Sequence, residues 1–137
     1  MTEGYLIKPI GFIRSELKST ADAPNFYTEG APDARLELIE DYRDGLKGIQ
    51  AGSEIIVITW LHLANRGVLQ VHPRGNPANP LTGVFLTRSP DRPNPLGLHR
   101  ARVLAIDGTN LQIGPIEAID GTPVIDIKRV VAEADDF

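Results

Sequence analysis

Apolar and polar residues alternate with a period of two along much of this 137-residue chain, and runs of β-branched residues recur. This pattern is typical of strands that bury one face, whereas the longer period of an amphipathic helix is almost absent. Strands are predicted at Tyr5–Arg14, Arg35–Ile39, Glu54–Leu63, Val68–Val71, Gly83–Thr87, Leu98–Ile106, Asn110–Ile116 and Pro123–Ile127. Asp41–Ile49 is predicted to form one short helix.

The strand pattern also indicates how the sheet is closed. Asp107-Gly108 stands between two of the predicted strands, which is a strong signal for a tight hairpin. Many short strands leave exposed edges unless the sheet closes on itself. We therefore predict a mainly β fold: a small closed or nearly closed antiparallel β-barrel with one short helix, forming a single domain over residues 1–137.

Prolines are concentrated in the middle of the chain, where six of the eleven lie from Pro73 to Pro95. Each proline fixes its own φ and biases the preceding residue toward extended backbone. The stretch VFLTRSPDRPNPLG at residues 84–97 is therefore predicted to be a stiff loop that presents Arg88, Arg92 and Asn94. The alternative is that the prolines only cap a sheet edge and the arginines are solvated.

Charge is unevenly distributed. The chain has a net charge of −4, but the segment from Trp60 to Arg102 holds six arginines and one acid, Asp91, for a net charge of +5. Such a polarised distribution fits an anionic ligand that meets one surface. The alternative is that charges clustered in the sequence scatter over the folded surface.

Several classes of site are excluded or unsupported. The chain has no cysteine, so disulfides and thiolate chemistry are excluded. The Gly-x-Gly turn of dinucleotide sites, the phosphate-loop lysine and the Gly-x-Ser-x-Gly elbow are missing. His62, His72 and His99 match no standard ligand spacing, so no metal is expected. The N-terminus lacks a secretion signal and no apolar run is long enough for a span, so we expect a cytoplasmic protein without a membrane partner.

Two further positions offer chemistry. Asp126 and Lys128 fall on one face of a predicted strand, where an acid and a base most often form a solvent-side ion pair. The functional interpretation places Asp126 near a cation or a proton to be moved. His62 ends an apolar strand, so it is either a core or rim residue or part of a site.

Several stretches, taken in order, resemble one known family. The most specific is Thr87-Arg88-Ser89 followed by Arg92-Pro-Asn-Pro-Leu-Gly97. The others are Asp120-Gly-Thr-Pro-Val-Ile-Asp-Ile-Lys128, Pro9–Ser15, Gly45–Gly48, Trp60–His62 and Val71–Gly75. Together they cover nearly the whole chain and resemble the TrmO family, also called TsaA-like, of S-adenosylmethionine-dependent tRNA methyltransferases.

The resemblance implies a β-barrel that binds S-adenosyl-L-methionine without a Rossmann fold. It also implies a homodimer with the donor site near the subunit boundary, and no metal. The reaction of the family is methyl transfer to N6 of threonylcarbamoyladenosine, the modified base beside the tRNA anticodon. The partners expected are therefore tRNA and a second copy of the chain.

The resemblance also implies site residues. Arg88 and Arg92 suit the donor carboxylate or an RNA phosphate, and Asn94 can bridge either. The remaining donor-binding candidates are Pro24, Asn25, Phe26, His62, Leu63, Ile116, Glu117, Ala118 and Ile119, of which the last four lie along the adenosine half. Candidates for a general base are Asp126 and His62, followed by Asp120 and Tyr27.

The chain departs from the family in three respects, one of which is that Arg129 follows Lys128 where the family usually has proline. Many relatives have an Arg-Gln pair where this chain has Asn25-Phe26, and longer relatives continue into a C-terminal domain that helps to grip tRNA. This sequence ends nine residues after Lys128, so we expect any tRNA to dock on the barrel itself. Two alternatives stay open: a methyltransferase for a small molecule, and a non-enzymatic barrel that binds an adenosine-containing ligand or RNA.

Overall fold

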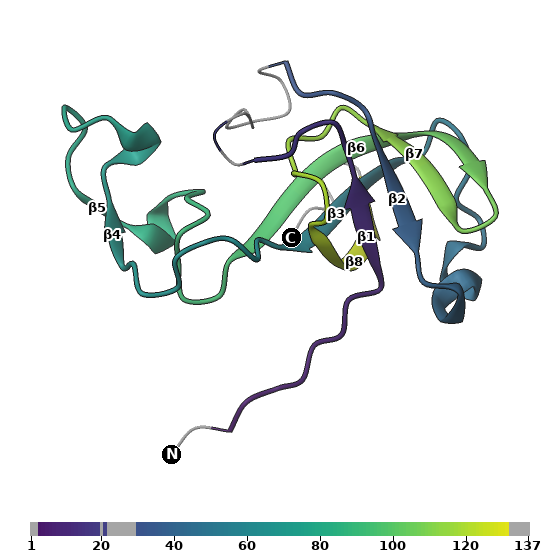
Figure 1. The fold of residues 1–137 in the computed structure, drawn as a ribbon, viewed down its shortest axis with the longest axis horizontal. Helices are drawn as coiled ribbons and strands as arrows, with labels where there is room; N and C mark the ends of the chain where they lie inside the picture. The colour runs from purple at the N-terminus through teal and green to yellow at the C-terminus, as the bar shows by residue number, and fades with distance from the viewer. Residues whose placement is uncertain (1–2, 20, 22–29, 132–137) are drawn as a thin grey trace.

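The computed structural model describes residues 3–19, 21 and 30–131, and its main body is a closed antiparallel β-barrel (Figure 1). The barrel strands are β1 Gly11–Arg14, β2 Ala34–Leu38, β3 Glu54–Trp60, β6 Leu96–Asp107, β7 Asn110–Gly114 and β8 Pro123–Arg129. Around the barrel they follow the order β1-β2-β7-β6-β3-β8. The predicted mainly β fold with a closed antiparallel barrel is therefore confirmed.

Strand β6 joins the two halves of the barrel because it pairs with two neighbours in succession. Its first seven residues, Leu96–Arg102, pair with β3, and its residues from Arg102 to Asp107 pair with β7, with a register shift between Val103 and Ala105. Successive side chains of a strand point to opposite faces. Gly97, His99, Ala101 and Val103 accordingly face inward and are buried, while the residues between them are exposed.

The barrel interior is filled mainly by aliphatic side chains. The buried residues at its centre are Ile13, Leu36, Ile55, Val57, Val103, Leu111, Ile113, Ile116 and Val124. Burying each side chain of this kind contributes about 1.5–3 kcal/mol, so this cluster is the main source of barrel stability.

The predicted hairpin is confirmed, but its turn is one residue later than the sequence pattern suggested. Asp107 pairs with Asn110, which leaves Gly108 and Thr109 as the two-residue loop. Gly108 has a φ of 63°, the left-handed region that glycine adopts without a Cβ penalty. Glycine at the first central position suits the tight turns that match the twist of a hairpin.

Several predicted boundaries are wrong for identifiable reasons. Tyr5–Arg14 was predicted as one strand, but β1 begins at Gly11, because Pro9 has no N–H for a sheet. The preceding residues leave the barrel as an extended segment (Figure 1), with Tyr5 95% exposed. The predicted helix Asp41–Ile49 is a 3₁₀ helix, η2 Glu40–Leu46.

Residues 61–95 form an arm that projects from the barrel (Figure 1). The arm contains a two-stranded sheet, β4 Gln70–Val71 and β5 Thr82–Gly83, and two 3₁₀ turns, η3 Pro73–Gly75 and η4 Val84–Leu86. The predicted strand Gly83–Thr87 is therefore wrong beyond Gly83. The carbonyl of Val84 accepts hydrogen bonds from Thr87 N (3.0 Å) and Thr87 Oγ1 (2.9 Å), which turns the chain back on itself.

Candidate functional site

The guanidinium of Arg92 is directed into its own loop. Nη1 donates to the carbonyls of Thr87 (3.0 Å) and Ser89 (2.9 Å), and Nη2 donates to the carbonyl of Val84 (2.9 Å). Hydrogen bonds from a charged donor are roughly twice as strong as neutral ones. Arg92 therefore holds the proline-rich loop together, and the side chain that was predicted to be displayed by the loop instead stabilises it.

Arg66, near the start of the arm, is hydrogen-bonded to the same proline-rich loop. Its Nε donates to the carbonyl of Pro93 (2.7 Å) and its Nη2 donates to Asn94 Oδ1 (3.1 Å). The guanidinium also lies 5.0 Å from the centre of the Trp60 ring, a cation–π distance. Asn94 was predicted as a ligand contact, and in the structure its carbonyl oxygen serves this internal bond.

Arg88, His62 and Leu63 remain available on the surface. All three are exposed. Among the described residues, Arg88 makes no hydrogen bond or ion pair to any other side chain or carbonyl, in contrast to Arg92 and Arg66. Of the arginines in the proline-rich loop, Arg88 is thus the one whose guanidinium faces outward.

The segment 116–119 follows β7 and turns back across the end of the barrel. Ile116, Ala118 and Ile119 are buried, and Glu117 is half-buried between them. Backbone bonds from Ile116 N to Pro32 O (3.0 Å) and from Asp120 N to Leu17 O (2.7 Å) fix its two ends. The predicted site residues Pro24, Asn25 and Phe26, with Tyr27, lie outside the described residues.

Three polar side chains form a buried line that leads from the barrel wall to this segment. Thr59 Oγ1 lies 2.7 Å from His99 Nε2, and His99 Nδ1 lies 2.6 Å from Glu117 Oε1. Thr59 is fully buried and His99 is 5% exposed. The second oxygen of Glu117, Oε2, is buried with no hydrogen-bond partner in the described part of the chain.

Thr59 and His99 were not predicted as site residues, although their positions in the sequence carry a signal. Both occupy inward positions of strands whose other inward residues are apolar, such as Val57 on β3 and Val103 on β6. A polar residue at such a position must find a partner, because an unpaired buried polar group is costly. Strand parity therefore could have identified the pair.

Asp126 and Asp120 have different surroundings. Asp126 is exposed on β8 and its Oδ2 lies 4.0 Å from Lys128 Nζ, which fits the solvent-side ion pair. Asp120 Oδ1 accepts a hydrogen bond from the backbone N–H of Ser15 (3.0 Å), and its Oδ2 lies 3.4 Å from Lys18 Nζ. The Ser15 bond, aided by Lys18, holds the pKa of Asp120 below its ordinary value.

The positive charge of the segment from Trp60 to Arg102 is partly neutralised in the folded chain. Glu54 on β3 accepts from Arg100 Nη2 (2.9 Å) and Arg102 Nη2 (3.1 Å) across the strand pair. The Arg100 hydrogen bond is the largest cause of the lowered pKa of the Glu54 carboxyl. Two of the six arginines thus face an acid that lies outside the basic segment in the sequence.

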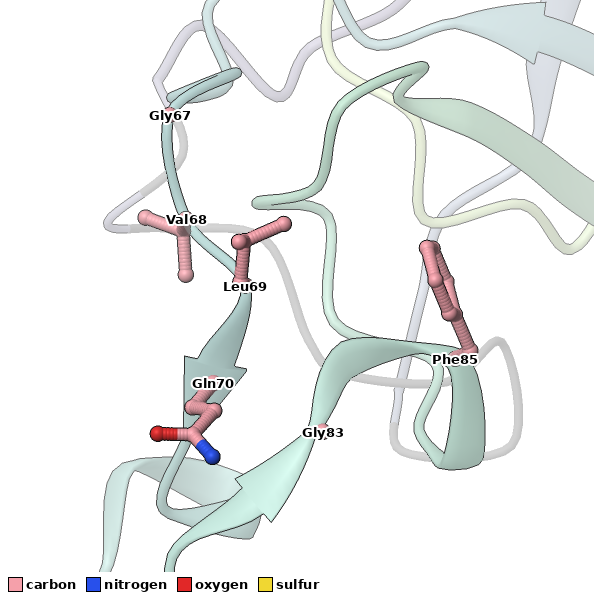
Figure 2. Close-up of a pocket in the computed structure, with 6 residues that line it drawn as sticks. All are labelled: Gly67, Val68, Leu69, Gln70, Gly83 and Phe85. Atoms are coloured by element: carbon pink, nitrogen blue, oxygen red, sulfur yellow. The ribbon is translucent and has the colours of Figure 1, made fainter.

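The arm also exposes apolar side chains around an open surface pocket of about 680 Å³. Its lining includes Leu69 and Phe85, which rise from either side of it in Figure 2. Phe85 is 81% exposed and the adjacent Leu86 is 86% exposed. Leu69 and Phe85 therefore make this part of the arm a candidate interaction surface.

Residues 3–19, 21 and 30–131 contain neither a cluster of metal ligands nor a membrane-spanning helix. No group of three or more histidines, cysteines and acids gathers there as a metal would require. No helix in that part of the chain has the length and apolar character needed to cross a membrane.

Comparison with known proteins adds sequence relatives. The profile of the family described as the tRNA-methyltransferase O N-terminal domain matches residues 12–136. A probable S-adenosyl-L-methionine-binding protein of Pyrococcus horikoshii is 41% identical over 130 residues, which cover 92% of this chain and 82% of that protein. An S-adenosyl-L-methionine-binding protein of Archaeoglobus fulgidus is 38% identical over 130 residues, which cover 95% of this chain and 92% of that protein.

Solved structures agree with the sequence relatives. A crystal structure of TrmO matches with a TM-score of 0.77 at 29% identity, over 100% of this chain and 60% of that chain. TrmO from Pseudomonas aeruginosa matches with a TM-score of 0.75 at 29% identity, over 98% of this chain and 60% of that chain. This chain therefore spans about three fifths of the length of those solved TrmO chains.

Proposed function

Because the chain belongs to the family of the tRNA-methyltransferase O N-terminal domain, we propose that it binds S-adenosyl-L-methionine and transfers the methyl group to tRNA. The observation that carries the proposal is the family match over residues 12–136. Relatives that this chain covers to 82% and 92% of their length are named as S-adenosyl-L-methionine-binding proteins. The acceptor that we propose is N6 of threonylcarbamoyladenosine.

The exposed and half-buried groups fit the chemistry of this donor. Its carboxylate suits the outward guanidinium of Arg88. Its adenosine has N–H and O–H groups, and Glu117 Oε2 is a buried acceptor without a partner among the described residues. Exposed Leu63 and Leu98 offer apolar surface for the purine. We propose that these residues, with His62 and the 116–119 segment, hold the donor.

The chain has little chemistry to supply, because the sulfonium of the donor activates the methyl group. Alignment of the donor with the acceptor nitrogen can contribute up to about 7–11 kcal/mol. The acceptor nitrogen also loses a proton, for which Asp126 and His62 stay our candidates as general base. Both are exposed and therefore accessible from solvent.

We propose a homodimer joined through the arm. Leu69, Phe85 and Leu86 are each more than half exposed and lie on one small structural unit. A second copy is the occupant favoured here, because a symmetric dimer buries the same patch twice. Arg74 is exposed on the same arm and is our candidate for a tRNA phosphate contact, since Arg88 is assigned to the donor. We propose that the reaction takes place in the cytoplasm.

A second candidate is a non-enzymatic binding protein for the same adenosyl ligand. A relative that this chain covers to 92% of its length is named for binding S-adenosyl-L-methionine. The pairing of Arg100 and Arg102 with Glu54 also lowers the positive charge that RNA would meet. Turnover separates this candidate from the enzyme.

The test uses labelled S-adenosyl-L-methionine and tRNA from cells with or without the threonylcarbamoyl modification. We expect label in the modified tRNA and none in the unmodified tRNA. Label in both would keep a tRNA methyltransferase but remove the proposed acceptor. Binding of the donor without transfer to either tRNA would support the non-enzymatic candidate.

A further inference from the structure

The 116–119 segment is fastened mainly on one side of the barrel. Its flanking residues bond to β1 and to the residues beside β1 and β2: Ile116 N to Pro32 O, Asp120 N to Leu17 O, and Gly121 N to Ile13 O (2.7 Å). On the opposite side, a polar contact to the β3–β6 wall is the 2.6 Å bond between Glu117 and His99. His99 therefore bridges the segment to the far wall.

The hydrogen-bonding groups of this line match one another. With a neutral imidazole, His99 Nδ1–H donates to Glu117 Oε1, and Nε2 accepts from the hydroxyl of Thr59. Each ring nitrogen is then used once. Thr59 thus sets the orientation of the His99 ring, and the ring sets the position of the Glu117 carboxylate.

A hydroxyl, an imidazole and a carboxylate in this order also resemble a nucleophilic triad, but burial excludes that role. Thr59 has no exposed surface. A Cβ at Gly97 would lie 2.5 Å from Thr59 Oγ1 and 2.7 Å from His99 Nε2, so the backbone of Gly97 packs directly over the pair. The hydroxyl cannot meet a substrate, and the line serves to position Glu117.

The hydrogen bond from His99 to Glu117 occupies Oε1 and leaves Oε2 of the same carboxylate without a hydrogen-bond partner among the described residues. Oε2 is also buried. A carboxylate oxygen that is removed from water without a hydrogen bond is costly, and a bound N–H or O–H group would offset that cost. The proposed function brings such groups to this segment, since an adenosyl ligand has ribose hydroxyls, an exocyclic amine and an ammonium.

We propose that Thr59 and His99 are positioning residues for Glu117, and that Glu117 Oε2 accepts a hydrogen bond from an N–H or O–H group of the adenosyl ligand. This inference rests on the proposed function. Changes at Thr59 or His99 in the barrel wall are therefore expected to alter the affinity for the donor through Glu117. The expected consequence is a larger effect on donor binding than on turnover.

The test is calorimetric titration of the whole protein with S-adenosylhomocysteine, which lacks the transferable methyl group. We expect Glu117→Gln to weaken binding about tenfold or more, as for the loss of a charged hydrogen bond. Thr59→Val, which keeps the shape of the side chain, weakens binding less. Glu37→Gln, on the strand pair of β1 and β2, is the matched control and binds as the unaltered protein does.

A double variant separates positioning from a general loss of packing. If Thr59 acts through Glu117, Thr59→Val has little further effect on affinity when Glu117→Gln is already present. Additive effects of the two changes would overturn the positioning role. In steady-state methyl transfer, the single variants raise KM for the donor and leave kcat within about threefold.

Further measurements identify the ligand group that Glu117 contacts and separate this inference from the proposed function. Methylthioadenosine lacks the amino acid, so an unchanged penalty of Glu117→Gln assigns the contact to the nucleoside, and a lost penalty assigns it to the ammonium. If Glu117→Gln does not fold, Thr59→Val alone carries the test. No binding by the unaltered protein overturns the proposed function, whereas binding unaffected by both variants overturns only this inference.

Discussion

The barrel and the arm are stabilised in different ways. In the barrel, aliphatic side chains such as Leu36 and Ile113 are fully buried. In the arm, Arg92 and Arg66 donate to backbone carbonyls, while Leu69 and Phe85 face outward. Apolar packing therefore stabilises the barrel, whereas hydrogen bonds from charged side chains stabilise the conformation of the arm.

This difference shows which apolar side chains and which guanidinium groups can contact a ligand or a partner. The arginines of the arm divide into two classes, since Arg92 and Arg66 bind the arm's own backbone, whereas Arg88 faces outward. The apolar residues divide in the same way between a filled barrel and an uncovered arm. Ligand and partner contacts are thus expected from Arg88 and the exposed apolar residues, with Arg92 as their support.

The largest expected effect comes from removing apolar contacts in the two regions. Ile113→Ala empties part of the barrel core and is expected to lower the free energy of unfolding by about 2–5 kcal/mol. Phe85→Ala removes an exposed side chain and is expected to change it by about 0.5 kcal/mol at most. Urea denaturation of dilute protein measures both. Equal losses would show that the arm is as well packed as the barrel.

A smaller and local effect is expected from Arg92→Lys, which keeps the positive charge but loses the guanidinium group that donates several hydrogen bonds at once. The hydrogen bonds to Thr87, Ser89 and Val84 are lost together, so the local opening free energy of the loop falls by about 1–3 kcal/mol. Hydrogen–deuterium exchange across residues 84–90 measures this change, with Arg88→Lys as the matched control. The comparison fails if Arg88→Lys loosens the loop as much as Arg92→Lys does.

The smallest effect at neutral pH is expected from Asp120→Asn, which keeps an acceptor for the Ser15 N–H. Because the pKa of Asp120 is lowered in the folded chain, its contribution to stability is present above its unfolded pKa, near pH 4, and is lost as the pH falls further. Asp120→Asn therefore flattens the decline in unfolding free energy on the acid side of about pH 4. Thermal melts across that range measure it.

Lys18→Met sharpens this prediction. The Ser15 hydrogen bond is the largest cause of the lowered pKa, and Lys18 is a lesser one. Lys18→Met should consequently leave most of the acid dependence in place. If Lys18→Met removes as much of it as Asp120→Asn does, the ion pair and not the backbone bond is responsible.

Most of the barrel could be predicted from the sequence because each barrel strand has its own period-two pattern. Glu54–Leu63 and Leu98–Ile106 correspond to β3 and β6 within a few residues. The arm could not be predicted in this way. The turn at η4 depends on hydrogen bonds to the Val84 carbonyl from Thr87 and from Arg92, eight residues downstream.

Only part of the candidate site could be predicted from the sequence, because the rest depends on contacts between residues that are distant in the sequence. The family motifs led to Glu117 and Arg88, but a motif does not state what a side chain contacts. Arg92 and Arg88 are the same residue type in one loop and face different ways. The role inferred for Glu117 depends on His99, which is 18 positions away in the sequence and adjacent only across the barrel.

The central claim is that the 116–119 segment and the proline-rich loop together hold the adenosyl donor. Hydrogen–deuterium exchange with and without S-adenosyl-L-methionine tests it most directly. We expect slower exchange in residues 87–98 and 114–122 when the donor is bound, and unchanged exchange in η2. No protection at saturating donor, or protection confined to the surface around η2, would contradict the account.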